Sequence, residues 1–391
     1  MNKIRLGFRF IDSRIWLGGY NYLLNLCAAV KKWNDQIQPV VFCGPHIPQA
    51  DQQRFQDLLG DDFVVTDVIS KQALRKRRAQ TLLFGRDKLA EQVFQTNQID
   101  AVFENADFYG RNFSIPCIAW VPDFQHRHMP EMFSKWRFWK REIGIRAQFR
   151  SSTRTIMLSS DDARNDCHRF YGVPMERINV VPFAVPFGDL PEETEWRQTV
   201  AKYDLPDRYL FLPNQFWKHK NHKVVVQALE LVKEQAADVV VVVPGAASNP
   251  VCVEVFKDIQ TRVADSGLEQ NFRLLGKIPY RDLICLLSRC TALINPSFFE
   301  GWSTTIEEAK AFGATMILSD LAVHREQVTE NGWFFSPNEP QQLADLLIET
   351  QDKLKPNRPD AAQLTATSDQ RMQVFVDRFV KLAEGSVKAP S

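Results

Sequence analysis

The chain has 391 residues, of which 45% are apolar and 24% charged, a composition that excludes a disordered chain and a small disulfide-stapled module. Its length favours two domains of roughly 150 to 200 residues each. Because 48 Lys and Arg nearly balance 47 Asp and Glu, nucleic acid is not an expected partner.

The two halves of the chain differ in charge. Residues 1–190 carry an excess of six basic side chains, and the remainder carries an excess of five acidic ones. This difference fits an anionic ligand or membrane near the first half, and it equally fits ordinary solvated faces.

The cysteines and the apolar runs bear on the cellular compartment. The seven cysteines are scattered and form no C-x-x-C pair, so we expect reduced thiols in the core and no zinc site. The first residues run into a strand-like segment without the apolar core of a signal peptide, and no apolar run approaches the ~20 residues that span a bilayer. We therefore expect a cytoplasmic protein, with peripheral contact to the inner face of the membrane left open.

Short apolar runs alternate with longer amphipathic stretches in the first half of the chain. The expected elements are strands at 4–10, 39–43, 101–103 and 115–121 and a helix at 20–32. These strands are apolar throughout, which predicts a parallel sheet covered by helices on both faces.

The same rhythm restarts after a segment rich in prolines and acidic residues. The expected elements are strands at 209–213, 238–244, 272–275 and 292–295, a helix at 223–235 and an amphipathic terminal helix at 368–382. We expect an α/β fold with two Rossmann-like domains across a cleft and a C-terminal helix that crosses back to the first. The expected boundaries are 1–185 for the first domain, 186–205 for a linker, 206–366 for the second domain and 367–391 for the helix and tail. Such sheets bind ligands at the carboxyl ends of their strands.

The segment 295–320, NPSFFEGWSTTIEEAKAFGATMILSD, carries the densest chemical signal. Thr304 and Glu307 have the spacing of a capping box at the start of a helix, after a loop that holds Glu300. The unpaired amides of a first helical turn suit a phosphate or diphosphate. The carboxylates of Glu300 and Glu308 can accept hydrogen bonds from paired sugar hydroxyls.

This segment resembles the signature of retaining glycosyltransferases of the GT-B fold, family 4, which has a glutamate, seven residues and a second glutamate followed by alanine. The resemblance implies that Glu300 contacts the donor sugar and that Glu308 holds the nucleotide ribose. Ser303, Thr304 and Thr305 stand where the family commonly has Gly-Leu-Pro. This departure leaves open whether their amides contact the diphosphate.

A second match lies at 209–229, which resembles the strand, loop and helix that supply basic side chains to the diphosphate in the family. Lys220 stands at the matching place and Lys218 is the alternate, since lysine is a compact cation suited to phosphate. Gln215 stands where the family usually has an arginine. A solvated loop would also carry such lysines.

The resemblance extends to segments that line the nucleotide in the family. They contain Gly245 and Gly276, although both glycines also fit simple turns. The expected donor-binding residues are Gln215, Lys218, Lys220, Gly245, Gly276, Lys277, Ile278, Glu300, Gly301, Ser303, Thr304, Thr305 and Glu308.

The first half matches more loosely. Gly18 and Gly19 resemble the paired glycines that lie beside the diphosphate and acceptor in the family, where glycine permits close approach of the backbone. A later buried strand leads into a loop with Asp123 and His126, the best candidates for the group near the transferred sugar; structural roles are the alternative. Asp107 is either an acceptor contact or a turn residue. The expected catalytic residues are Glu300, Lys220, His126 and Asp123.

Aromatic and basic residues alternate in 133–150, which suits an anionic membrane surface or a lipid-linked substrate as well as a helix that packs its aromatic side inward. The basic run 75–78 either assists that contact or is solvated.

These patterns predict a retaining glycosyltransferase that moves a sugar from a nucleotide diphosphate donor to a hydroxyl of a glycan, lipid-linked glycan or small molecule. Polysaccharide or glycoconjugate biosynthesis is the expected setting. No D-x-D pair lies beside the donor signature, so we expect no metal requirement and no cofactor other than the co-substrate. The alternatives are an epimerase or phosphorylase of the same fold, or an inactive sugar-nucleotide sensor.

Overall fold

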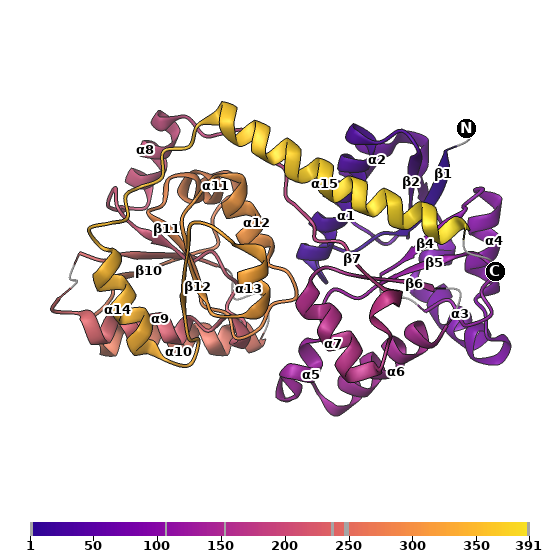
Figure 1. The fold of residues 1–391 in the computed structure, drawn as a ribbon, viewed down its shortest axis with the longest axis horizontal. Helices are drawn as coiled ribbons and strands as arrows, with labels where there is room; N and C mark the ends of the chain where they lie inside the picture. The colour runs from indigo at the N-terminus through magenta and orange to yellow at the C-terminus, as the bar shows by residue number, and fades with distance from the viewer. Residues whose placement is uncertain (1–2, 106–107, 152–153, 236–237, 246–249, 389–391) are drawn as a thin grey trace. The chain divides into compact units, whose positions relative to one another are not determined.

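The computed structural model describes residues 3–105, 108–151, 154–235, 238–245 and 250–388 (Figure 1). The chain divides into two compact units, one running to Ala184 and resuming at Gln370, the other running from Val185 to Asp369. Each unit is a parallel sheet layered with helices, so the expected α/β fold with two Rossmann-like domains is confirmed. The terminal helix α15 (Ala361–Lys388) runs through the boundary between the units.

The first unit contains a seven-stranded parallel sheet with the order β3-β2-β1-β4-β5-β6-β7. Its strands are β1 (Ile4–Arg9), β2 (Ile37–Cys43), β3 (Phe63–Val65), β4 (Ala101–Glu104), β5 (Cys117–Trp120), β6 (Arg154–Leu158) and β7 (Ile178–Val180). Its helices are α1 (Leu17–Trp33), α2 (Gln49–Leu59), α3 (Lys71–Phe84), α4 (Lys88–Thr96), α5 (Gln125–His128), α6 (Lys135–Arg150) and α7 (Asp161–Tyr171). The strand order reverses between β1 and β4, because β1 lies between β2 and β4.

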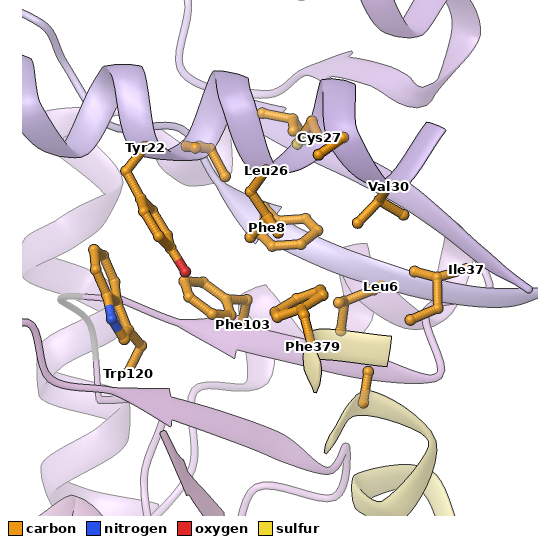
Figure 2. Packing of buried hydrophobic residues seen from close by; sticks show 14 of the residues in the cluster. Leu6, Phe8, Tyr22, Leu26, Cys27, Val30, Ile37, Phe103, Trp120 and Phe379 are labelled. Carbon is orange, nitrogen blue, oxygen red and sulfur yellow. The ribbon is translucent and has the colours of Figure 1, made fainter. Parts of the chain in front are cut away.

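The strands of this sheet are apolar throughout because both faces are buried. Phe8 packs with α1 on one face, and its ring stacks on Phe379 of α15 (6.4 Å between centroids; Figure 2). Val40 and Phe42 of β2 pack on the other face, in the cluster that includes α4. The C-terminal part of α15 is therefore part of the first core. All seven cysteines are buried and free, as expected.

The second unit contains a six-stranded parallel sheet with the order β10-β9-β8-β11-β12-β13. Its strands are β8 (Leu210–Phe211), β9 (Val241–Pro244), β10 (Phe272–Gly276), β11 (Ala292–Asn295), β12 (Met316–Ser319) and β13 (Gly332–Phe335). Its helices are α8 (Glu193–Lys202), α9 (His222–Val232), α10 (Pro250–Asp265), α11 (Tyr280–Arg289), α12 (Thr304–Ala311), α13 (Ala322–Gln327) and α14 (Pro340–Thr350). Valines of β9 alternate between two cores, with Val241 and Val243 facing one and Val242 the other.

The segment expected to be a linker, 186–205, contains α8. Trp196 and Val200 of this helix are buried in the core of the second unit, and the Trp196 indole donates a hydrogen bond to the Tyr209 hydroxyl at 3.2 Å. The prolines of 180–196 therefore precede a packed helix that belongs to the second unit, and the acidic Glu193 and Glu195 lie in its first turn.

Candidate functional site

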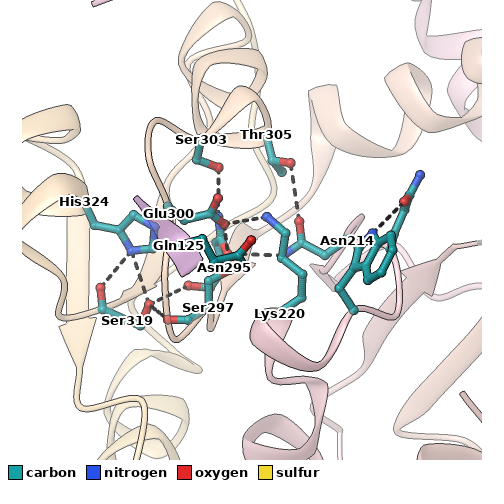
Figure 3. A network of polar contacts seen from close by, with 12 residues as sticks. Gln125, Asn214, Lys220, Asn295, Ser297, Glu300, Ser303, Thr305, Ser319 and His324 are labelled. Carbon is teal, nitrogen blue, oxygen red and sulfur yellow. Dashed lines mark hydrogen bonds and ion pairs between the residues drawn. The ribbon is translucent and has the colours of Figure 1, made fainter. Parts of the chain in front are cut away.

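A buried polar network lies at the carboxyl ends of β8 and β11, where the strand order of the second sheet reverses (Figure 3). The Asn214 side chain donates to Oδ1 of Asn295 at 3.2 Å, and Asn295 donates to the Ser303 hydroxyl at 3.0 Å. All three side chains are buried. Ligands of open α/β sheets bind at such reversal points, so this edge is the expected place for a site.

Lys220 and Glu300, which come from different loops, meet in this network. The Lys220 Nζ lies 2.5 Å from Oε1 of Glu300. Lys220 ends a single 3₁₀ turn, and the next residue, Asn221, has a left-handed backbone with φ of 51°. The Asn221 side chain donates to the carbonyls of Pro296 and Pro337, at 3.1 and 2.8 Å. These two bonds fix the backbone from which Lys220 extends.

Glu300 is ionised in this setting. Burial alone would raise the pKa of its carboxyl, but the charge of Lys220, aided by His324 and His219, outweighs burial and lowers the pKa to about 2. The Ser297 hydroxyl lies 2.7 Å from the same carboxylate oxygen. The arrangement is therefore a rigid, nearly enclosed ion pair at the edge of the sheet.

The start of α12 differs from the predicted capping box. The N-cap is Ser303, whose side chain caps no helix amide, and Thr304 is the first helical residue. Glu307 points into the protein instead of back to the cap. It accepts hydrogen bonds from Gln327 at 3.0 Å and Lys310 at 3.1 Å. The capping-box prediction was wrong because a buried amide on α13 competes for this carboxylate.

The Gln327 side chain also makes two hydrogen bonds to the backbone of Ser303. Its Oε1 accepts from the Ser303 amide at 3.1 Å, and its Nε2 donates to the Ser303 carbonyl at 2.8 Å. The Ser303 amide is thus engaged within the protein. The first intrahelical bond is donated by Glu307 to the Ser303 carbonyl, so the amides of Thr304 and Thr305 have no intrahelical acceptor.

Glu308 contrasts with Glu300. Its side chain is half-buried, and among the described residues no hydrogen bond or ion pair reaches it. Burial raises the pKa of its carboxyl to about 7. An unpartnered carboxyl near a sheet edge has its full accepting capacity available to hydroxyl groups of a ligand.

The two glycines expected in the donor site adjoin the network from β9 and β10. The Gly245 amide donates to the Gly276 carbonyl at 2.9 Å. A Cβ at Gly245 would lie 2.9 Å from the Phe216 ring and 3.1 Å from the Asn214 carbonyl, so the close packing there requires glycine. Gly276 has a φ of 66°, which glycine adopts without strain.

The other predicted donor residues lie nearer the surface. Gln215 and Lys218 are exposed, and Oε1 of Gln215 accepts from the Trp217 indole at 3.0 Å. Lys277 is exposed. Ile278 and Gly301 are partly buried.

The predicted residues of the first unit do not form one cluster. His126 is fully buried, and its Nε2 lies 3.3 Å from Glu142 and 3.2 Å from the Tyr171 hydroxyl; burial lowers its pKa to about 4. Asp123 is partly exposed and pairs with Arg141 at 2.5 Å. His126 thus braces α5 against α6 and α7. Asp107 lies outside the described residues.

Gly18 and Gly19 lie in the first turn of α1, at the carboxyl edge of the first sheet. Within the basic run 75–78, Arg77 is buried and pairs with Asp87 at 2.6 Å. Its side chain is therefore neither solvated nor available to a membrane surface.

Within the segment 133–150, residues Lys135–Arg150 form α6, which has an apolar exposed stripe. Trp136, Trp139 and Ile143 have 75%, 59% and 65% of their surface exposed. Their spacing places them on one side of the helix. No helix in the described part of the chain is both long and apolar enough to cross a bilayer.

Two further observations concern the wider surface. Within the described ranges, no group of three His, Cys, Asp or Glu side chains is placed to hold a metal ion.

A cavity of about 670 Å³ opens at the opposite edge of the second sheet, where strands begin, and its lining includes Tyr209 and Thr291. Because open parallel sheets bind ligands at the carboxyl edge, the polar network is the better candidate.

Several residues of the network carried no sequence prediction. Asn295 is the last residue of β11, and Asn214 follows Leu212 and Pro213 after the end of β8; the end of an apolar run is the one local signal that marks them. Gln327 and His324 come from α13, a helix outside the recognised motifs. The buried His324 donates through Nδ1 to the Ser319 carbonyl at 2.8 Å, which ties α13 to the end of β12.

Comparison with known proteins connects this site to a family. Residues 192–361 match the family described as Glycosyl transferases group 1. The O-antigen chain mannosyltransferase B of Escherichia coli is 23% identical over 255 residues, a match that covers 62% of this chain and 64% of that protein. The chain therefore matches somewhat less than two thirds of this relative's length.

Solved structures share the fold of the whole chain. A glycosyltransferase from Rickettsia africae superposes with a TM-score of 0.72 at 15% identity, covering 100% of both chains. Anabaena Alr3699/HepE in complex with UDP-glucose superposes with a TM-score of 0.66 at 16% identity, covering 98% of both chains. The fold is that of GT-B glycosyltransferases.

The residues that match this family, 192–361, make up most of the second unit and include the whole polar network.

Proposed function

We propose that this protein is a retaining glycosyltransferase that takes a sugar from a nucleotide diphosphate donor and transfers it to a glycan or lipid-linked acceptor in polysaccharide biosynthesis. The observation that carries the proposal is the pairing of Lys220 with Glu300 beside the first turn of α12, with the unpartnered Glu308 one turn further along. The O-antigen name of the Escherichia coli relative supports the biosynthetic setting.

Each of these groups is suited to a different part of the donor. Lys220 and the amides of Thr304 and Thr305 supply positive charge for the diphosphate, whose negative charge grows as the sugar leaves. Glu300, which is held ionised, accepts hydrogen bonds from hydroxyls of the sugar, and Glu308 accepts hydrogen bonds from the ribose hydroxyls. Lys220 passes from a carboxylate partner to a diphosphate, so the ion pair preorganises a cation at the reacting end of the donor.

Retention follows from the arrangement we propose for the leaving group. The diphosphate departs on the side from which the acceptor hydroxyl enters, and it takes the proton of that hydroxyl. The carbon–oxygen bond to the diphosphate breaks while the bond to the acceptor forms on the same face. No protein carboxylate needs to form a covalent adduct.

We also propose that α6 contacts anionic lipid. Trp136, Trp139 and Ile143 form the exposed apolar stripe, and Lys135 and Lys140 on the same helix are exposed cations. Such contact would place the enzyme at the surface where lipid-linked acceptors are found.

The proposal is tested by product analysis with GDP-mannose and UDP-glucose as first donors, chosen from the mannosyltransferase relative and the UDP-glucose complex. We expect transfer only when acceptor is present, with the anomeric configuration kept in the NMR spectrum of the product. Conversion of the donor sugar without acceptor would indicate an epimerase, and consumption of inorganic phosphate would indicate a phosphorylase.

A further inference from the structure

Helix α13 contacts the polar network through His324, which is fully buried. The Nδ1 atom of this residue lies 2.8 Å from the Ser319 carbonyl oxygen and 3.3 Å from the Ser319 hydroxyl (Figure 3). A carbonyl oxygen can only accept a hydrogen bond, so Nδ1 carries the proton and the ring has one defined tautomer. Burial lowers the pKa of this imidazole, which keeps the ring neutral at neutral pH. His324 is therefore a neutral donor directed at the end of β12.

The Ser319 hydroxyl connects β12 to the loop that follows β11. Its Oγ lies 2.6 Å from the Ser297 carbonyl oxygen, to which it donates its single proton, with a longer contact of 3.4 Å to the Asn295 carbonyl. The lone pairs of the same Oγ are available to the proton on Nδ1 of His324. The imidazole thus favours the orientation in which this hydroxyl donates to Ser297. Both serines are fully buried, so bulk water does not compete for these bonds.

The Ser297 side chain continues this path to Glu300. Its hydroxyl lies 2.7 Å from Oε1 of Glu300 and 2.7 Å from Oδ1 of Asn295, and it has one proton to donate. The ionised carboxylate is the stronger acceptor, and Oδ1 of Asn295 already accepts from Asn214, so donation to the carboxylate is favoured. Lys220 binds the same carboxylate oxygen. Both donors therefore hold Oε1, and within the described part of the chain no hydrogen bond reaches Oε2.

We infer that His324 positions the Glu300 carboxylate for the donor sugar. Through Ser319 and Ser297, the imidazole fixes one carboxylate oxygen and leaves the other available to accept hydrogen bonds from sugar hydroxyls. The inference rests on the proposed function, since it takes Glu300 as the contact to the sugar. The competing role is purely structural, with His324 only joining α13 to β12.

The Ser319 residue allows the two roles to be separated. Its carbonyl joins α13 to β12, whereas its hydroxyl carries the path toward Glu300. Ser319→Ala removes the hydroxyl and keeps the carbonyl, so it interrupts the path without removing the bond between His324 and β12. His324→Leu removes both functions. His324→Asn restores an N–H donor on the atom bonded to Cγ, as Nδ1 is in histidine.

Isothermal titration calorimetry of the full chain provides the test. The ligands are GDP-mannose and UDP-glucose, compared with GDP and UDP, which lack the sugar. A residue that positions Glu300 affects the affinity for the sugar nucleotide and not the affinity for the nucleoside diphosphate. Val323→Ala is the matched control, because it shortens a fully buried side chain of the same helix that lies outside the path.

We expect His324→Leu and Ser319→Ala to weaken binding of the sugar nucleotide about fivefold or more, while affinity for the nucleoside diphosphate changes less than about twofold. His324→Asn should recover part of the loss. Val323→Ala should lower the Tm without changing the ratio of the two affinities. The double variant His324→Leu, Ser319→Ala should bind no more weakly than the weaker single variant, because both changes interrupt one path.

Three results would overturn the inference. These are an equal loss for both kinds of ligand in Ser319→Ala, no loss for either, and additive losses in the double variant. If His324→Leu does not fold, Ser319→Ala and His324→Asn decide, since both keep a bond between α13 and β12. A wild-type chain that binds none of the four ligands contradicts the proposed function as well. A chain that binds a sugar nucleotide normally, without a sugar-specific loss in Ser319→Ala, retains the proposed function and loses only this role of His324.

Discussion

Replacing Glu308 with glutamine is expected to stabilise the free protein at pH 8 while weakening nucleotide binding. Burial raises the pKa of this carboxyl to about 7, and among the described residues it has no partner to offset its charge. A group whose folded pKa lies above its unfolded value destabilises the folded state once the pH exceeds the unfolded value. The stability of the wild type should therefore fall between about pH 4.5 and pH 7 through this residue and then level off.

The size of the effect follows from the pKa shift. A shift from 4.5 to about 7 corresponds to roughly 3 kcal/mol if the group were fully buried. Because Glu308 is only half-buried, we expect about 1 to 2 kcal/mol, which is roughly 2 to 8 °C in Tm for a unit of this size. Glutamine keeps the shape without the charge. The Glu308→Gln variant should thus match the wild type at pH 5 and exceed it at pH 8.

The assay is thermal unfolding from pH 5 to pH 9 with and without nucleotide sugar. A charged hydrogen bond to ribose contributes about 1.5 to 3 kcal/mol, so the donor KM of Glu308→Gln should rise by roughly one to two orders of magnitude. If Glu308→Gln lowered the Tm equally at pH 5 and pH 8, the reasoning about burial of this carboxyl would be refuted. An unchanged donor KM would refute the assignment of Glu308 to the ribose.

Lys220→Ala should lower kcat roughly 100-fold. It should also lower the free energy of unfolding by about 3 kcal/mol, because it leaves Glu300 buried without a cation. Adding Glu300→Gln should restore the stability measured by chemical denaturation but not the turnover. Glu307→Gln should lower stability by about 1 to 3 kcal/mol, because its buried carboxylate accepts two bonds, with less than a tenfold change in kcat. Activity should persist in EDTA, and restoration of lost turnover by magnesium or manganese would contradict this. Flotation with anionic vesicles at low salt should be lost in the double variant Trp136→Ala, Trp139→Ala, and equal binding to neutral vesicles would argue against a basic contact surface.

The fold could be predicted because its signal is local. Uninterrupted apolar runs such as the valines of β9 occur where a strand is buried on both faces, so they predict a parallel sheet without knowledge of what covers it. Five strands were not among those expected, namely β3, β6, β7, β12 and β13, and of these β3 and β7 have only three residues each. A run of three residues carries too little periodicity to distinguish a strand from a loop.

The site could be predicted only in part, because its partners are distant in sequence. Two separate sequence matches contained Glu300 and Lys220, and the structure shows that these residues, 80 positions apart, form one ion pair. The role of Glu307 was misjudged because its hydrogen-bond partner, Gln327, lies on a helix that no local pattern links to α12.

The most direct test of the central claim is a crystal structure of the protein with a bound nucleotide sugar. We predict the ribose hydroxyls on the Glu308 carboxylate, the diphosphate between Lys220 and the first turn of α12, and the sugar hydroxyls on Glu300. A nucleotide bound elsewhere, for example in the cavity at the opposite edge of the second sheet, with Glu308 and Lys220 left untouched, would contradict the claim.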